Sequence, residues 1–208
     1  MTPAELFGAI LDGDGEPVLR DDRGRARALP VDVWLGRAGA VDERVLDHAR
    51  GPVLDVGCGP GRHVHALARR GVLGVGVDLS PVAAALARRQ GATVLEASIF
   101  DRVPGARRWN SALLLDGNIG IGGSPDALLR RLAGLLARGG AVLVELDPPG
   151  VGVVHERVRL EDGAGASAWF AWARVGADAV EGPAYAAGLR VLARWEDGGR
   201  FFAELRAP

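Results

Sequence analysis

The chain has 208 residues, which is enough for one well-cored domain and too few for two full ones. Apolar residues make up 48% of it and its longest apolar runs have the length of a strand, so we expect a globular protein without a membrane partner. The formal net charge is −1 and the arginine pairs are spread along the chain, which argues against nucleic acid as a partner. Cys58 is the only cysteine and no secretory leader is recognisable, so we expect a cytoplasmic location.

Residues 1–51 form a segment of mixed character. The stretch "PAELFGAIL" at 3–11 predicts a short helix, and a Gly- and Asp-rich loop and a hairpin are expected after it. A second helix is expected over "AVDERVLDHA" at 40–49. We interpret this segment, including "VDVWLGR" at 31–37, as a lid or cap on the rest of the molecule.

Residues 52–147 alternate between strand and helix. Short, nearly continuous apolar runs predict strands at 51–57, 72–78, 92–98, 111–117 and 141–147. Helices are expected at 60–71, 80–91 and 124–140, the last two opening with Ser-Pro as N-cap and first helical residue. The stretch 100–110 is too broken by Pro and Gly for a helix. This alternation predicts an α/β fold with a doubly wound, mostly parallel sheet that is covered on both faces.

Residues 148–208 should add antiparallel structure. The alternating stretches "VVHERVRL" and "ASAWFAWARV" predict an inserted hairpin around "EDGAGA" at 161–166. An ill-defined helix follows near 176–187, and a terminal hairpin turns at Asp197-Gly198-Gly199. We treat residues 1–208 as one domain built from a cap segment (1–51), an α/β core (52–147) and this last part (148–208).

The stretch "DVGCGPG" at 55–61 is the first candidate site. Gly57, Gly59 and Gly61 follow a strand and open a helix, where glycines permit a tight turn and let a ligand approach the backbone. The dinucleotide fingerprint would need its third glycine at position 62, where Arg62 stands. Asp78 ends the second strand, and a carboxylate there can hold the ribose of NAD or of an adenosyl group equally well.

The stretch "VLDVGCGPGRHVHALARRGVLGVGVDLS" at 53–80 resembles the first two motifs of the class I S-adenosylmethionine-dependent methyltransferases. That family has an acidic residue, then Gly-x-Gly-x-Gly, then an acidic residue at the end of the second strand. The resemblance implies a Rossmann-like sheet of seven strands, whose antiparallel last strand would come from the terminal hairpin. It also implies S-adenosylmethionine as the cofactor.

The resemblance implies a role for each of these residues. The glycine backbone would lie against the methionine part, Asp55 would reach the ammonium group through water, Asp78 would hold the ribose and Leu79 would pack on the adenine. After the third strand, Ser98 and Ile99 stand where the family often has an Asp for the adenine amino group. The expected cofactor contacts are therefore Asp55, Gly57, Cys58, Gly59, Gly61, Asp78, Leu79, Ser98, Ile99 and Asp116.

Two of these assignments have structural alternatives. Asp55 and Asp78 are residues that also cap turns. A lone cysteine in a crowded turn is more often packed than nucleophilic, so we expect Cys58 to pack. On the following helix, Arg62, His65 and Arg69 share one stripe, which we expect to face solvent.

A second glycine loop, "LLLDGNIGIGG" at 113–123, follows the fourth strand. It is similar to the leucine-rich strand and Gly-Asn of glycine N-methyltransferase and related small-molecule enzymes. The resemblance implies that Asn118 holds the substrate, with Asp116 and Gly117 beside it. The alternative is a tight turn before the Ser124 cap. Asp147, after the fifth strand, is a further substrate candidate unless Pro148-Pro149 merely steer the chain outward.

Methyl transfer from a sulfonium is an in-line displacement that needs positioning and exclusion of water more than a fixed catalytic motif. A hydroxyl acceptor would need a general base, whereas an amine need only arrive neutral. Besides Asn118, His63 and His155 are the candidate catalytic residues, each with a surface or core position as its alternative. Trp169 and Trp172 of the inserted hairpin are candidates for covering the substrate. We expect no metal site.

The sequence therefore predicts a methyltransferase that acts on a small molecule through an N, O or C atom, as a monomer or homodimer. One alternative is a dinucleotide-dependent oxidoreductase, against which Arg62 speaks. Another is a non-catalytic module that binds S-adenosylmethionine. A methyltransferase acting on RNA or protein is disfavoured by the neutral charge.

Overall fold

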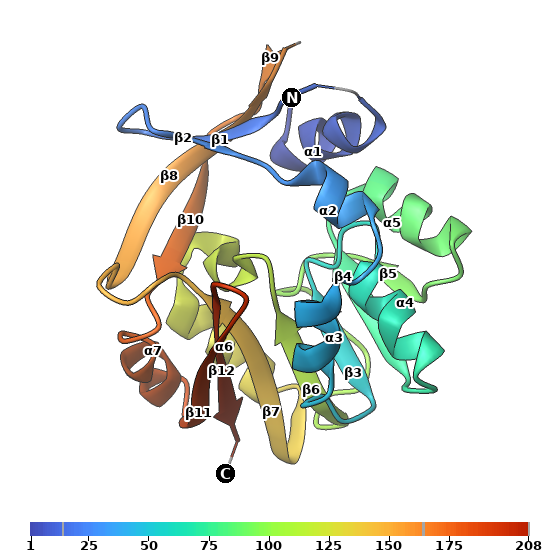
Figure 1. Ribbon diagram of the computed structural model, residues 1–208, viewed down its shortest axis with the longest axis vertical. Coiled ribbons are helices and arrows are strands. Elements are labelled where there is room, and N and C mark those ends of the chain that lie inside the picture. Colours follow the sequence, from blue (N-terminus) through green and yellow to red (C-terminus); the bar gives the residue numbers. More distant parts are fainter. Residues whose placement is uncertain (14, 164, 208) are drawn as a thin grey trace.

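The computed structural model describes residues 1–13, 15–163 and 165–207 and contains two sheets (Figure 1). The main sheet has seven strands in the order β11-β12-β7-β6-β3-β4-β5. Its strands are β3 (Val53–Val56), β4 (Gly74–Asp78), β5 (Val94–Glu96), β6 (Trp109–Leu114), β7 (Leu136–Leu146), β11 (Arg190–Asp197) and β12 (Arg200–Arg206). β3 to β7 pair in parallel, and β12 pairs antiparallel with both β7 and β11. The predicted doubly wound sheet, including its antiparallel strand from the terminal hairpin, is confirmed.

Helices cover both faces of this sheet. On one face, α3 (Ala40–Leu46) and α4 (Arg62–Arg69) pack on β3, and α5 (Pro81–Arg89) packs beside α4. On the other face, α6 (Pro125–Ala133) and α7 (Glu181–Ala186) enclose the larger apolar core. The predicted N-caps of α5 and α6 are present, since each serine hydroxyl accepts a hydrogen bond from the backbone of the third residue after it. None of the helices in the described ranges has the length and apolar character that a membrane crossing requires.

The boundary between α6 and β7 differs from the prediction. The helix was expected to continue to residue 140, but α6 ends at Ala133 and β7 begins at Leu136. Leu135 and Leu136 are buried in the core, and the Leu135 carbonyl accepts a hydrogen bond from the Trp109 amide at 3.3 Å. Pairing with the neighbouring strand therefore overrides the helical pattern of "LAGLLARGG".

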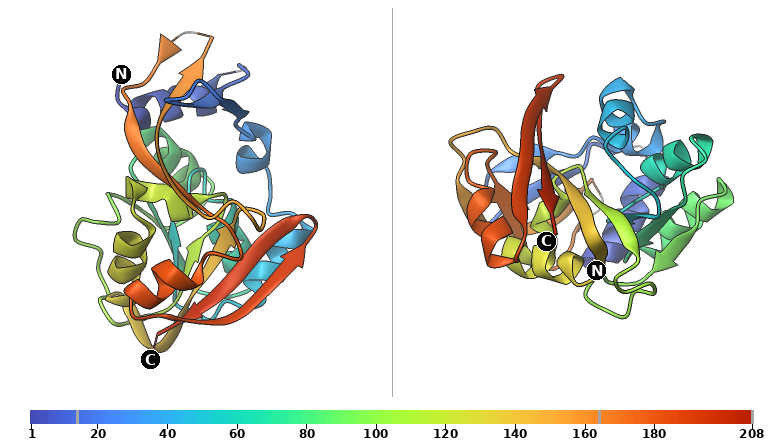
Figure 2. Two further views of the ribbon diagram at one scale, coloured as in Figure 1. Left: turned by 90° about the vertical axis from the view of Figure 1, so that its left-hand side faces the viewer. Right: turned by 90° about the horizontal axis from the view of Figure 1, so that it is seen from below.

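The second sheet joins the two ends of the chain. It consists of β1 (Val18–Asp21), β2 (Ala26–Ala28), β8 (Val153–Asp162), β9 (Gly165–Ala166) and β10 (Phe170–Val175), in the order β10-β8-β1-β2 with β9 paired to β8. The sequence predicted the N-terminal and inserted hairpins separately and did not foresee that they form one sheet. Residue 164, in the turn predicted at 161–166, lies outside the described residues. Figures 1 and 2 show this sheet rising beside the main sheet toward α1.

The N-terminal segment bridges the two sheets. Helix α1 (Pro3–Asp12) packs Leu6 and Ile10 on Leu160 of β8, and its Gly8 lies against Val82 at the start of α5. A short helix that the sequence did not predict, α2 (Val31–Leu35), follows β2. The cap segment is therefore anchored both to the second sheet and to the helix layer of the main sheet.

Candidate active site

The first glycine turn is built as the sequence predicted. Gly57, Gly59 and Gly61 all have left-handed φ angles, of 68°, 52° and 88°. A Cβ on Gly57 would lie 2.8 Å from the Asn118 amide nitrogen, so packing requires this glycine. At Gly59 the nearest atom to such a Cβ is 4.0 Å away, on the ring of Phe7. The turn is therefore tightly packed below and open at Gly59, where a ligand can reach the backbone.

Cys58 is buried beneath this turn, and its Sγ donates a hydrogen bond to the Gly59 carbonyl at 3.6 Å. Its thiol packs among apolar residues of α4, α5 and β5, beneath Gly76. Burial raises the pKa of the Cys58 thiol, and the nearby Asp55 and Asp78 carboxylates raise it further. The side chain is therefore a packed thiol, in agreement with the packing interpretation.

Asp78 holds the turn from the end of β4. Its Oδ2 accepts a hydrogen bond from the Gly59 amide and its Oδ1 one from the Ser80 amide, both at 2.8 Å. Burial raises the pKa of Asp78, while these two donors lower it. The turn-capping alternative is thus present, but each carboxylate oxygen has a second lone pair that can still accept a ribose hydroxyl. Leu79 follows with its side chain 59% exposed, free to pack on a ring.

The loop after β5 supplies a different apolar residue from the one predicted. Ile99 is 3% exposed and its side chain packs in the core, and its predicted contact with the cofactor stays a prediction. The next residue, Phe100, is exposed and lies against Gly122 of the second glycine loop. The Ser98 hydroxyl accepts a hydrogen bond from the Phe100 amide at 3.1 Å and keeps its own proton to donate. Phe100 was missed because the sequence gives no sign of which side chain of "SIF" turns outward.

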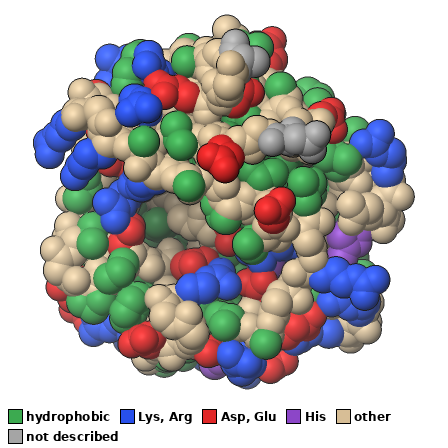
Figure 3. Space-filling view, turned by 45° about the horizontal axis from the view of Figure 1, so that its top comes forward, with side chains coloured by type: hydrophobic (Ala, Val, Ile, Leu, Met, Phe, Trp, Pro, Cys, Tyr) green, Lys and Arg blue, Asp and Glu red, His purple; other side chains and the backbone are tan. Residues whose placement is uncertain are grey.

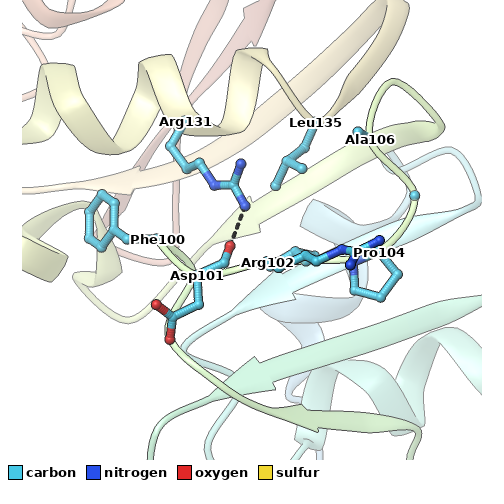
Figure 4. Close-up of a pocket in the computed structure, with 9 residues that line it drawn as sticks. Phe100, Asp101, Arg102, Pro104, Ala106, Arg131 and Leu135 are labelled. Carbon is cyan, nitrogen blue, oxygen red and sulfur yellow. Dashed lines mark hydrogen bonds between the residues drawn. The ribbon is translucent and has the colours of Figure 1, made fainter.

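A cavity lies on the other side of this loop (Figure 4). Figure 4 shows Arg131 of α6 donating to the Asp101 carbonyl across it, with Phe100 and Pro104 at its ends. None of the predicted site residues lines this cavity. This cavity lies between the loop and the end of α6, and it is not the candidate site.

Asp55 and His63 form a buried pair under the glycine turn. His63 Nδ1 lies 3.6 Å from Asp55 Oδ2, and its Nε2 lies 3.7 Å from Asp42 Oδ1 of α3. Burial lowers the pKa of His63, but the two carboxylates more than offset this and raise it to about 9. The ring is therefore an imidazolium at neutral pH, which favours a positioning role over the proton-accepting role considered from the sequence.

Arg62 lies in an ion network rather than in solvent. It is 4% exposed and donates to Asp42 and, at 2.5 and 2.6 Å, to both oxygens of Asp116. Arg200 of β12 donates to Asp42 at 2.7 Å and to Glu145 of β7 at 2.8 Å. The expectation of a solvent-facing Arg62 is wrong because α3 covers the start of α4 and supplies a carboxylate. The network ties the ends of β6, β7 and β12 to the helix after the glycine turn.

Asn118 also belongs to the first turn. Its amide nitrogen donates to the carbonyls of Val56 and Gly57, at 2.9 and 3.0 Å. Both amide protons are thereby engaged with the backbone on the predicted cofactor side. Gly117 beside it is exposed, with a φ of 80°, and Asp116 before it has a φ of 58°. Sequence reasoning placed Asn118 in the right region but assigned its donors to the substrate.

Strand β10 of the second sheet packs on the second glycine loop. This loop forms the 3-10 segment η1 (Asn118–Gly123). A Cβ on Gly120 would collide with the Trp172 indole and the Ala173 carbonyl, and one on Gly123 would lie 2.6 Å from the Ala171 side chain. His155 Nδ1 lies 2.8 Å from the Gly123 carbonyl. The glycines therefore let β10 approach the loop, and His155 anchors β8 to it.

Of the remaining candidates, the structure brings Trp172 to the site and keeps Trp169 away. Trp169 stacks under the guanidinium of Arg159, 4.9 Å from its ring centre, on the face of the second sheet away from α1. Asp147 is paired with Arg174 of β10, whose Nε donates a hydrogen bond to Asp147 Oδ1 at 3.1 Å. Its carboxylate thus joins the end of β7 to the second sheet.

The N-terminal segment lies over the glycine turn. Phe7 is the side chain nearest to Gly59. The centre of the Trp34 ring of α2 lies 5.7 Å from the centre of the Phe7 ring. The Trp34 indole N–H is buried without a partner among the described residues. Figure 3 shows a hollow on the face where this segment comes forward. Within the described ranges, no three His, Cys, Asp or Glu side chains are grouped to hold a metal ion.

Residues 53–140 match the sequence model of a family described as "Methyltransferase domain". The matched range covers the strands and helices from β3 to the start of β7, including both glycine loops. It confirms the prediction of a methyltransferase from the motifs at 53–80.

Solved structures share the fold over most or all of the chain. A SAM-dependent methyltransferase from Bacteroides fragilis, in complex with S-adenosyl-L-homocysteine, matches with a TM-score of 0.83 and 22% identity, over 100% of this chain and 97% of that one. The amino pentose methyltransferase CalS10 from Micromonospora echinaspora, bound to SAM, matches with a TM-score of 0.58 and 22% identity, over 84% and 92%. A Burkholderia thailandensis N-methyltransferase matches with a TM-score of 0.61 and 19% identity, over 85% and 81%. The Rossmann-like methyltransferase fold is thereby confirmed.

Proposed function

We propose that this chain, which carries a methyltransferase domain at residues 53–140, transfers the methyl group of S-adenosylmethionine to a small-molecule acceptor. The observation that carries the proposal is the open glycine turn with a carboxylate at the end of each adjoining strand, Asp55 on β3 and Asp78 on β4. Carboxylates beside the turn suit a cofactor that bears a sulfonium and an ammonium group.

The residues present fit this cofactor. Gly59 leaves room at the backbone, Asp78 has lone pairs for two hydroxyls and Leu79 offers an exposed apolar surface for a ring. Asp55 Oδ2 is buried at 3.6 Å from its ion-pair partner His63 Nδ1, and it can also accept a hydrogen bond from a water that bridges to the ligand. When bound, the cofactor supplies a methyl group activated by its positive sulfur.

The chain itself contributes holding and enclosure. Asn118 and the Arg62–Asp116 pair fix the two glycine loops relative to each other, so that the loops after β3 and β6 meet at one place. Phe7 and Trp34 cover the turn from the N-terminal side, and the second sheet covers it from the other. Enclosure excludes water and orients the acceptor, which is the main requirement of a displacement at an activated methyl.

The arrangement also speaks against a dinucleotide. Arg62, at the position of the third fingerprint glycine, is already paired with Asp42 and Asp116, and its bulk fills the start of α4. We propose a cytoplasmic protein acting as a monomer or homodimer. The small acceptor is supported by neighbours of the same fold described as methyltransferases of an amino pentose and of 1,6-didemethyltoxoflavin.

Thermal melting with added ligands tests this function. S-adenosylhomocysteine should raise the melting temperature, as any ligand selective for the folded state does, whereas NAD and NADP should not. Asp78→Ala should lower the affinity for S-adenosylhomocysteine about ten- to hundredfold, because ribose hydroxyls lose their acceptor. Ser80→Ala, which removes only the α5 cap, is the control for stability loss without ligand contact. Stabilisation by NAD instead of S-adenosylhomocysteine would contradict the proposal.

A further inference from the structure

Glu156 is a buried carboxylate with an unused oxygen. It lies on β8 at 8% exposure, and its Oε1 accepts a hydrogen bond from Arg27 of β2. Its Oε2 is buried and has no partner among the described residues. A charged oxygen in this state is unfavourable unless a donor reaches it, so the residue is placed to receive one from outside the chain.

Glu156 shares a face of the second sheet with Trp172. Residues directly opposite each other on antiparallel strands point to the same side, and Trp172 lies opposite Glu156 while Phe170 lies opposite Val158. The part of this face around Leu160 and Phe170 packs on α1. In the part around Glu156, the Trp172 indole contacts Gly120 of η1.

Direct contacts connect this part of the face to the first glycine turn. The Trp172 indole packs on Gly120 of η1. From the same short segment, Asn118 holds the Gly57 carbonyl and Ile121 reaches the Gly57 position at 3.0 Å. Glu156 is therefore the cross-strand neighbour of a side chain, Trp172, that packs on the segment beside the first glycine turn.

The charges on this face balance. Arg27 is paired with Glu156, and Arg174 with Asp147. Asp21, which also lies on this face, is paired with Arg25. A neutral donor therefore fits the free Oε2 without leaving an uncompensated charge.

We propose that Glu156 recognises the methyl acceptor, its Oε2 accepting a hydrogen bond from a hydroxyl or un-ionised amine of a small molecule whose apolar part lies on Trp172. This inference rests on the proposed methyl-transfer function, which it deepens by naming the chemistry of the acceptor. The Arg27 side chain, which is paired with the other oxygen of Glu156, is 36% exposed.

Matched ring compounds test the proposal in protein saturated with S-adenosylhomocysteine. Cyclohexanol carries a donor, whereas cyclohexanone has the same ring and only an acceptor, and saturation-transfer NMR titration gives their relative affinities. We expect cyclohexanol to bind about tenfold tighter than cyclohexanone, the size of one hydrogen bond to a charged group. Equal affinities, or no binding of either compound, would overturn the proposal.

Three variants sharpen the test. In Glu156→Ala the preference for cyclohexanol should disappear. In Glu156→Gln the amide oxygen should stay with Arg27 and leave the NH₂ group facing the ligand, and because the oxygens of both compounds can accept from it, the preference should also disappear. Glu161→Gln is the control, because Glu161 lies on the same strand but on the opposite face, paired with Arg20 and Arg159.

A donor preference that survives in Glu156→Ala would also refute the assignment. Calorimetric titration of S-adenosylhomocysteine on the same samples separates the two proposals. Lack of its binding contradicts the methyltransferase function itself. Binding without any donor preference contradicts only the role of Glu156.

Discussion

Asn118 and His63 show how single side chains determine the shape of the site. Asn118 lies in the loop after β6, but its side-chain amide donates hydrogen bonds to two carbonyls at the first glycine turn, those of Val56 and Gly57. His63 lies in the first turn of α4 and is held as a cation between the carboxylates of Asp42 and Asp55. In both residues the chemistry is determined by partners distant in the sequence.

Replacing Asn118 should weaken cofactor binding. Asn118→Ala leaves the Val56 and Gly57 carbonyls without their donor, and the turn that carries Gly59 loses its support. We expect a loss of about 1–2 kcal/mol in the free energy of unfolding and about a tenfold weaker affinity for S-adenosylhomocysteine by calorimetry. Asn110→Ala is the matched control, since Asn110 lies near the start of β6, at the other end of the strands, where it donates to the Gly51 carbonyl. Unchanged affinity with reduced turnover would restore the original substrate role of Asn118.

His63 should make stability depend on pH in the alkaline range. Its pKa is about 9 in the folded chain and about 6.5 in the unfolded chain, so the folded state binds more protons between these values. Its stabilising contribution is therefore complete below pH 6.5 and is lost as the pH rises toward 9. The total loss should be at most about 3 kcal/mol.

Urea unfolding at pH 6, 7.5 and 9 measures this loss. His63→Gln should be less stable than the native chain at pH 6 and nearly independent of pH over the range. His155→Gln is the control, because His155 is exposed and contacts only the Gly123 carbonyl in the described structure. An equal slope in the native chain and in His63→Gln would show that another group is responsible.

At the level of elements, η1 connects the main sheet to the second sheet, because it contacts both. Asn118 and Ile121 on one side contact the first glycine turn, and Gly120 and Gly123 on the other accept β10. The glycines of "DGNIGIGG" thus serve the packing of backbone against backbone rather than a phosphate. β10 is thereby coupled through η1 to the first glycine turn.

A side chain at Gly120 should break this connection. In Gly120→Ala the new Cβ would collide with the Trp172 indole and the Ala173 carbonyl, so β10 must move away. We expect a loss of about 1–3 kcal/mol in unfolding free energy and a larger loss in turnover than in cofactor affinity. Gly182→Ala in α7 is the control, since its Cβ would meet nothing within 4 Å. A fully stable and active Gly120→Ala would mean that β10 does not dock on η1 in solution.

At the scale of the whole molecule, one glycine turn is covered from two directions. The N-terminal segment reaches it through Phe7 and Trp34, and the second sheet reaches it through η1. Because β1 pairs with β8, these two covers are parts of one structure. A ligand on the turn should therefore stabilise residues at both ends of the chain.

Hydrogen exchange with and without S-adenosylhomocysteine tests this coupling. We expect slower exchange at 57–61 and 78–80, and also in α1, η1 and β10, because the bound cofactor reduces local opening of the covers. Strand β11, at the edge of the main sheet in Figure 2, is the internal control and should change little. Protection limited to the glycine turn would show that the covers move independently of the ligand.

The sequence by itself determined the α/β core. Strands of four to eight apolar residues, Ser-Pro helix starts at 80–81 and 124–125, and the left-handed glycines of "DVGCGPG" are local signals, and local signals survive folding because they depend on neighbouring residues. The same motifs predicted the glycine turn and the carboxylate of Asp78 beside it, and the role of both as the cofactor site stays a prediction.

Only the tertiary structure decided how the rest is arranged. The pairing of β1 with β8, the burial of Arg62 between Asp42 and Asp116, and the turning inward of Ile99 all depend on residues far away in the chain. Periodicity along a segment states which residues share a face, but not which surface that face meets. The partner of Asn118 and the unused oxygen of Glu156 became visible for the same reason, since a hydrogen bond is defined by two positions in space.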